Sequence, residues 1–273
     1  LGFDLPLIDT GIDSPAESAI LVIAVVYGIA ALFNLRIPHT GAHYPHQQRN
    51  PVRLVIDFAR CFTVLWKDKL GQISLAVTTL FWGAGATLQF IVLEWARVSL
   101  ELPLSKAAAL QGVVALGIAV GAILAARFIP LRGSLRVLPV GVAMGVFVPL
   151  MTLVSSLPVA YGLLVAVGSL AGFFVVPMNA LLQHRGHVLM SAGHSIAVQN
   201  FNENLNVLLM LGLYSLLIRM HLPIHWVITL FGVFVAITMM LVVMRHNQNQ
   251  QVFDAVALIG DGRPHDGPHS SAH

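Results

Sequence analysis

The chain has 273 residues, of which 57% are hydrophobic and only 10% are charged. A soluble domain carries about 25% charged residues, so this composition excludes an ordinary soluble globular protein. The mean hydropathy of +0.81 predicts an all-α membrane protein that crosses the bilayer several times. The formal net charge of +3 is small, and the positions of the charges are more informative than their sum.

The first segment, residues 1–34, joins an acidic start to an apolar span. Residues 1–17 hold Asp4, Asp9, Asp13 and Glu17 but no Lys or Arg, and the apolar run covers about residues 18–33. We expect an extracytoplasmic segment followed by a membrane helix. Because the chain begins at Leu1 rather than at Met, we also expect it to be a fragment of a longer protein. Its single cysteine, Cys61, excludes an internal disulfide framework.

The second segment, residues 35–71, is basic and ends in an amphipathic pattern. At helical spacing, one face carries apolar side chains and another carries Arg53, Asp57 and Arg60. The apolar face consists of Val52, Val55, Ile56, Ala59, Phe62 and Trp66. This pattern predicts a cytoplasmic linker with a helix that lies on the membrane surface. Binding of a partner helix is the alternative.

The third segment, residues 72–246, contains six further apolar spans and predicts a six-helix bundle. The spans cover residues 73–95, 107–128, 137–154, 157–182, 196–218 and 224–244. We expect residues 247–273, rich in Gln, Asn, Gly and His, to form a disordered tail. The tail histidines, His265, His269 and His273, do not have the spacing of a metal site, and we expect no bound metal.

The basic residues of the loops predict the orientation. Arg127, Arg132 and Arg136 follow one span, Arg185 follows another, and Arg245 follows the last. If each span crosses once, these residues and the basic linker lie on one side of the membrane. The positive-inside rule then places the C-terminus in the cytoplasm.

One polar face interrupts the apolar span 196–218. Gln199, Asn202, Glu203 and Asn206 fall within about a third of the helix circumference. An ionisable residue inside a membrane span usually faces protein, water or a ligand, so this face predicts the wall of a polar cavity. The alternative is that these side chains only bond neighbouring helices.

A second candidate face lies in span 73–95, where Ser74, Thr78, Trp82, Gly85, Ala86 and Gln89 share one side. We expect Trp82 and Gln89 to contribute to substrate binding, and a helix-packing seam is the alternative. Asn179 and Gln183, near the cytoplasmic end of span 157–182, are candidates for an inner gate. Gly117, Gly121 and Ala125 recur every four residues and predict a packing ridge.

Three stretches together carry a resemblance to a known family. They are Thr-Leu-Phe-Trp-Gly-Ala-Gly-Ala-Thr-Leu-Gln at residues 79–89, Gly-Phe-Phe-Val-Val-Pro-Met-Asn-Ala-Leu-Leu-Gln at 172–183, and Ser-Ala-Gly-His-Ser-Ile-Ala-Val-Gln-Asn at 191–200, followed by Glu203 and Asn204. They resemble the bacterial lysophospholipid transporters, which are twelve-helix members of the major facilitator superfamily. Gly121 and the basic turn that follows it, with Arg127, Arg132 and Arg136, also resemble an incomplete form of that superfamily's loop signature. The resemblance covers nearly all of residues 18–246 and implies helices six to twelve.

The resemblance implies a multi-pass protein of the bacterial inner membrane that moves lysophospholipids, chiefly lysophosphatidylethanolamine, from the outer to the inner leaflet. It implies a cytoplasmic acyltransferase/acyl-carrier-protein synthetase as a partner, with no cofactor and no nucleic acid. The resemblance implies a basic residue at the position of Gln89. If that residue holds a phosphate, this protein must use another group for it or prefer a different head group.

Three alternatives to lysophospholipid transport stay open. A facilitator-type permease or exporter for another amphiphile or a drug would have the same fold. A membrane enzyme is disfavoured, because His-Glu-x-x-His, Gly-x-Ser-x-Gly and paired carboxylates within a span are all absent from the sequence. The third alternative is that the fragment alone transports nothing, because half a facilitator lacks one wall of its cavity.

Overall fold

The computed structural model describes residues 15–37, 50–252 and 259, and all its regular elements in those ranges are helical. Within these residues, seven helical segments are long and apolar enough to cross a membrane, which confirms an all-α membrane protein with about seven spans. The chain divides into two units, residues 1–49 and residues 50–273. The first unit contains α1 (Pro15–Asn34), whose apolar side chains are exposed.

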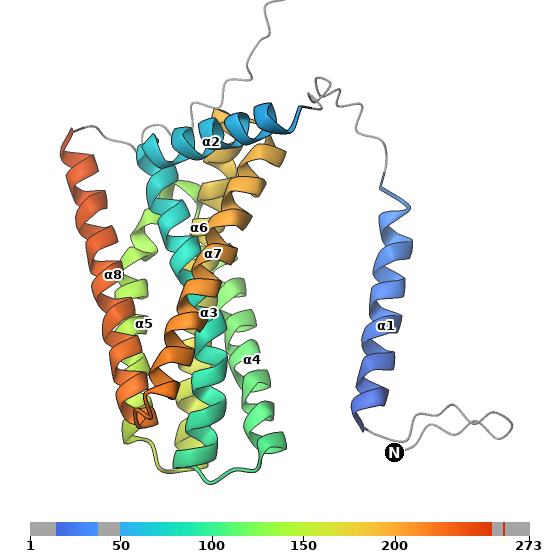
Figure 1. The fold of residues 1–273 in the computed structure, drawn as a ribbon, viewed down its shortest axis with the longest axis vertical. Helices are drawn as coiled ribbons and strands as arrows, with labels where there is room; N and C mark the ends of the chain where they lie inside the picture. The colour runs from blue at the N-terminus through green and yellow to red at the C-terminus, as the bar shows by residue number, and fades with distance from the viewer. Residues whose placement is uncertain (1–14, 38–49, 253–258, 260–273) are drawn as a thin grey trace, which may run out of the picture. The chain divides into compact units, whose positions relative to one another are not determined.

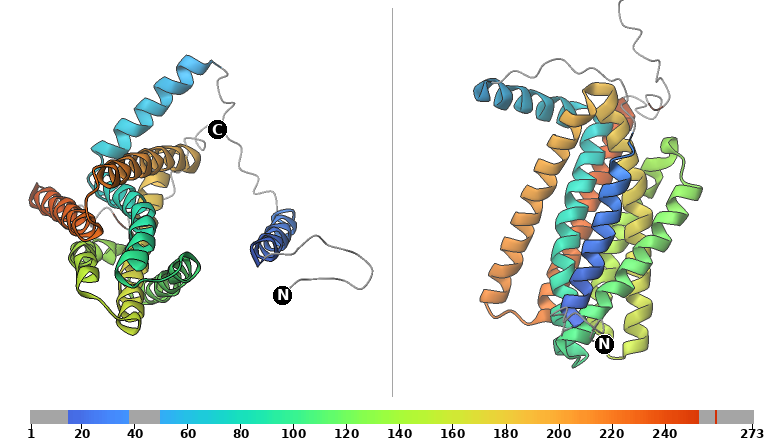
Figure 2. Two further views of the ribbon diagram at one scale, coloured as in Figure 1. Left: turned by 60° about the horizontal axis from the view of Figure 1, so that its bottom comes forward. Right: turned by 90° about the vertical axis from the view of Figure 1, so that its right-hand side faces the viewer.

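The second unit is a helical bundle with one helix across its end (Figure 1). In chain order its elements are α2 (Pro51–Lys67), α3 (Lys69–Ser99), α4 (Leu104–Phe128), η1 (Leu131–Val137), α5 (Leu138–Phe147), η2 (Val148–Leu153), α6 (Leu157–Leu189), α7 (Ala192–Arg219) and α8 (Ile224–Val252). Helix α3 is central and contacts α2, α4, α6, α7 and α8. Figure 2 shows the same unit from two further directions, with α2 at a large angle to α3.

The turn between α2 and α3 depends on Asp68. Asn50 caps the start of α2, with Pro51 in the first turn, where its missing N–H costs nothing. Asp68 ends α2 and caps α3, because its Oδ1 accepts a hydrogen bond of 2.7 Å from the backbone N–H of Gly71. Arg185 of α6 donates from Nε and Nη2 to the two carboxylate oxygens of Asp68, at 3.0 and 2.7 Å. The end of α2 is therefore fixed to both α3 and α6.

Two helix pairs pack backbone against backbone. A Cβ added at Gly121 of α4 would overlap the carbonyl oxygen of Ser169 on α6, and one added at Gly172 of α6 would overlap that of Ile118 on α4. Similarly, a Cβ at Gly145 of α5 would overlap the backbone of Ala236 on α8. The predicted ridge of small residues on α4 is confirmed as a helix–helix contact.

Three boundaries differ from the prediction. Helix α6 continues to Leu189 and includes Arg185, which the sequence placed in a loop after the span 157–182. The Arg185 side chain pairs with Asp68. The predicted span 137–154 is divided into α5 and a 3₁₀ helix, with Pro149 at the junction, where it cannot donate a backbone hydrogen bond. Helix α8 continues to Val252, into the predicted tail.

The last turns of α8 are held against the start of α3. Arg245 donates from Nε to Gln72 Oε1 at 3.3 Å, and Asn249 donates from Nδ2 to the carbonyl oxygen of Lys69 at 3.4 Å. The remainder of the predicted tail, including its three histidines, lies outside the described residues, with the exception of Ile259.

Candidate functional site

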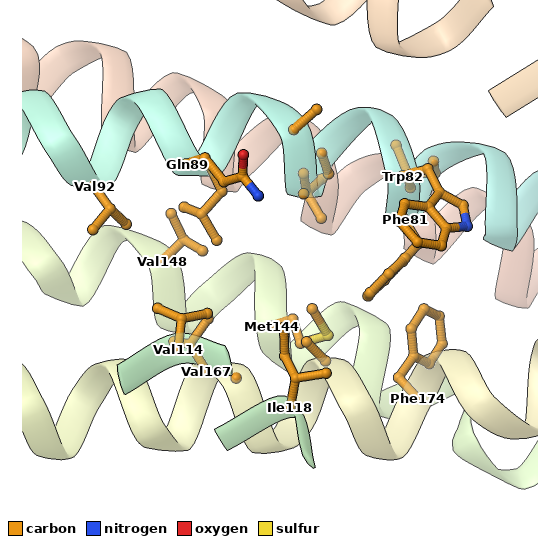
Figure 3. A pocket seen from close by; sticks show the side chains of 18 of the residues that line it. Phe81, Trp82, Gln89, Val92, Val114, Ile118, Met144, Val148, Val167 and Phe174 are labelled. Carbon is orange, nitrogen blue, oxygen red and sulfur yellow. The ribbon is translucent and has the colours of Figure 1, made fainter. Parts of the chain in front are cut away.

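A cavity of about 370 Å³ lies between α3, α4, α5, α6 and α8 (Figure 3). Its walls are mostly aliphatic and aromatic, and the polar side chains among its lining residues are Trp82, Gln89 and Gln111. Both residues predicted on α3, Trp82 and Gln89, therefore line one cavity. Both are also exposed, Trp82 at 48%.

Gln89 lies toward one end of the cavity and Trp82 toward the other, about two turns apart on α3 (Figure 3). Gln111 of α4 donates from Nε2 to the backbone carbonyl oxygen of Gln89 at 2.8 Å, which ties α4 to α3 at that end. The ring of Phe81 packs edge-on against Trp82, with 5.8 Å between centroids. Gln111 was not predicted, although a lone amide in the apolar span 107–128 is a signal that points to it.

The polar residues of α7 form a separate feature, which we call the polar row: Gln199, Glu203 and Asn206. Gln199 donates from Nε2 to Glu203 Oε1 at 2.8 Å and to Asn179 Oδ1 on α6 at 3.1 Å. Gln199, Glu203 and Asn206 are all partly exposed. Among the described side chains, no Lys or Arg forms an ion pair with Glu203.

The side-chain amides of the two predicted asparagines of α7 donate hydrogen bonds to helix backbone carbonyl groups. Asn206 donates from Nδ2 to the carbonyl oxygen of Thr79 at 2.8 Å and lies directly on Gly83, where an added Cβ would overlap it. Asn202 is buried and donates from Nδ2 to the carbonyl oxygen of Val198 in its own helix, at 2.7 Å. For Asn206, the alternative of bonding a neighbouring helix is what the structure shows.

The polar row and the cavity are neighbours, but they are not the single shared hollow that we expected. Within the described part of the chain, the α7 residue that lines the cavity is Val207, and the residues of the polar row do not. The row ends at Asn206, which packs on Gly83, and Gly83 follows Trp82 in α3. Gln183, the second predicted gate residue, is exposed toward the C-terminal end of α6.

The arrangement offers hydrogen-bonding groups and one carboxylate beside an apolar cavity. Clusters of three or more His, Cys, Asp or Glu that could hold a metal ion are absent from the described residues. Such a combination suits an amphiphilic ligand with a polar end and an apolar end.

The chain is similar to proteins named lysophospholipid transporter LplT from Yersinia pestis (strains Pestoides F and Angola) and Yersinia pseudotuberculosis. Each is 45% identical over 208 residues, which cover 76% of this chain and 51% of the relative. The chain thus spans about half the length of these relatives, which fits a C-terminal portion of such a transporter. No family model matches the chain. No solved structure matches it either.

Proposed function

We propose that this chain forms the C-terminal part of an inner-membrane transporter that moves lysophospholipids. Its similarity to proteins named lysophospholipid transporter supports this assignment. In this proposal the lipid passes from the outer to the inner leaflet, where a cytoplasmic acyltransferase/acyl-carrier-protein synthetase re-acylates it. The helices of an opposing bundle complete the path, and the two bundles rock against each other. The C-terminus lies in the cytoplasm, in accordance with the basic residues of the loops.

The observation that carries the proposal is the carboxylate of Glu203 within a membrane-spanning helix. A carboxylate in the bilayer is costly unless it has a partner, and its hydrogen bonds from the neutral side chains of Gln199 and Thr78 supply no opposite charge. The ammonium group of an ethanolamine head would supply the opposite charge. The amides of Gln199 and Asn179 lie beside it and would bond the phosphate and glycerol oxygens.

Trp82 and Gln89 belong to the same proposed path, one helix away from the polar row. Both are exposed on α3, and Trp82 is adjacent to Gly83, on which Asn206 packs. We expect these two side chains to contact the lipid below its head group. Asn179 and Gln183 are retained as candidates for the inner gate.

The test is uptake of labelled lysophosphatidylethanolamine by the full-length protein with Glu203→Ala. We expect uptake to fall about tenfold or more, the effect of losing one charge-assisted contact. Lysophosphatidylglycerol, which lacks the ammonium group, should be less affected. Asn204→Ala is the matched control, because the Asn204 amide is exposed and bonds only the carbonyl oxygen of Asn200 among the described residues. Unchanged uptake by Glu203→Ala at normal expression would remove Glu203 from the mechanism.

A permease or exporter for another amphiphile is the second candidate. It is favoured by the neutral amide at Gln89, where the resemblance implies a basic residue. Competition distinguishes the two: lysolipids should displace the labelled substrate, whereas unrelated amphiphiles and drugs should not.

A further inference from the structure

The cavity beside α3 is lined mainly by apolar side chains. Its three polar side chains, Trp82, Gln89 and Gln111, come from two helices. Much of the remaining wall is built by bulky apolar side chains from α5, η2, α6 and α8. These are Met144, Val148, Phe174, Phe231, Val235 and Met239.

This interior is unsuited to a phosphate or an ammonium group. Charged groups in an apolar environment are costly, and none of the lining side chains carries a charge. An alkyl chain makes no such demand and gains dispersion contacts with the wall. The volume of about 370 Å³ falls within the range of about 300–1,000 Å³ that is typical of small-molecule sites.

The cavity also lies where the apolar end of an amphiphile held at the polar row would reach. Val207, which lines the cavity, follows Asn206 directly in α7. Trp82, at one end of the cavity, precedes Gly83, which is in contact with Asn206. The end of the polar row at Asn206 is thus adjacent to the cavity wall, which is where the tail of a molecule held at Glu203 and Gln199 would have to enter.

We propose that this cavity is an acyl-chain site, which takes the single fatty-acyl chain of a lysophospholipid while the head group occupies the polar row. The proposal rests on the proposed transport of lysophospholipids. It differs from the simpler expectation that the chain remains in the bilayer during transport. It makes the depth of this cavity a determinant of the acyl-chain length that the transporter accepts.

The first test locates the chain directly. A lysophosphatidylethanolamine with a photoreactive diazirine at the terminal carbon is added to the full-length protein in vesicles and irradiated. We expect labelled peptides to contain Met144 of α5 or Phe174 of α6, which line the cavity. Labelling confined to Leu208 and Leu209, which are exposed on α7, would place the chain outside this cavity and overturn the proposal. Labelling confined to Leu213 and Phe234 would also overturn it, because they line a second cavity between α3, α7 and α8.

The second test shortens the cavity. Gly85 lines it, and a Cβ added there meets no atom within 4 Å, so the side chain of Gly85→Leu starts in open space and is expected to extend into the cavity. We expect this variant to raise KM for the palmitoyl lysolipid about tenfold, because the leucine displaces several methylenes of the chain. KM for the butanoyl lysolipid should stay unchanged.

The matched control is Gly162→Leu on α6. A Cβ added at Gly162 also meets no atom within 4 Å, and Gly162 does not line the cavity. Thermal unfolding of both variants in detergent shows whether the fold is kept, and Gly85→Ala provides a milder step. Equal KM changes for long and short chains would overturn the acyl-chain site. If the wild-type protein moves no lysolipid of any length, the proposed function itself fails, which is a different result.

Discussion

Asp68 is the residue on which one end of the bundle depends. Its carboxylate accepts three hydrogen bonds, one from the backbone of Gly71 and two from the guanidinium of Arg185. The side chains of Arg185 and Asp68 are only 6% and 12% exposed. A bidentate pair with so little water around it has a fixed geometry, so α2, α3 and α6 meet there in one arrangement.

Removing one partner of this pair should be costly. We expect Arg185→Ala to lower the free energy of unfolding by about 3 kcal/mol, because the Asp68 carboxylate would be left without its counter-charge. Denaturation in detergent, monitored by tryptophan fluorescence, measures the effect. Arg97→Ala is the control: its pair with Glu94 is 3.5 Å long and more exposed, and its loss should cost about 0.5 kcal/mol. Equal losses in the two variants would contradict this assignment.

Among the helices, α4 and α6 pack in direct backbone contact, because glycine at the contact positions has no side chain to separate them. Gly117 and Gly121 of α4 lie against the backbone of α6, and Gly168 and Gly172 of α6 lie against that of α4. Close contact of this kind gives van der Waals attraction along the whole seam, which is the main attraction available between helices in lipid.

A leucine at Gly121 should force the two helices apart. We expect Gly121→Leu to destabilise the protein by about 3 kcal/mol, since the new side chain has only the rigid backbone of Ser169 and Phe173 to displace. Thermal unfolding in detergent would detect it. Gly112→Leu, on the same helix but with no atom within 4 Å of the new Cβ, should unfold like the wild type. A stable Gly121→Leu variant would show that the seam is loose.

The sequence predicted the helices well because hydropathy and length decide which segments cross a bilayer. It did not predict that α6 continues past Arg185, because the stabilising partner, Asp68, is 117 residues away in the chain. The polar face of α7 was recognised, but its direction depends on neighbours. Asn206 faces α3 and Gln199 faces Asn179 of α6, so the cavity that α3 lines lies beyond the row.

At the scale of the molecule, the orientation of residues 50–252 in the membrane follows from where their charges lie. The amphipathic α2 and the basic turn at Arg132 and Arg136 belong to one side, and Ser155, in the turn between η2 and α6, belongs to the other. The positive-inside rule predicts that the first side is cytoplasmic. Cys61 in α2, the single cysteine of the chain, is a natural reporter of that side.

The pKa of the Cys61 thiol decides the pH at which this cysteine can be labelled. Burial raises the pKa of the Cys61 thiol, and the nearby Asp57 carboxylate raises it further. A thiol with a raised pKa holds less of the reactive thiolate at neutral pH. Its alkylation should therefore be slow at pH 7 and accelerate as the pH rises toward its pKa, and Asp57→Asn should make it faster. An alkylation rate that does not change with pH would contradict this environment.

Labelling of intact cells at mildly alkaline pH then reports the orientation. We expect a membrane-impermeant maleimide to leave Cys61 unmodified until the cells are permeabilised, because a cytoplasmic α2 is out of its reach. The complementary variant, Ser155→Cys with Cys61→Ser, places an exposed thiol at the opposite end of the bundle and should be labelled without permeabilisation. The reverse pattern would invert the bundle. It would place the predicted inner gate at Asn179 and Gln183 on the outer face, so lipid delivery to a cytoplasmic acyltransferase would require a different path.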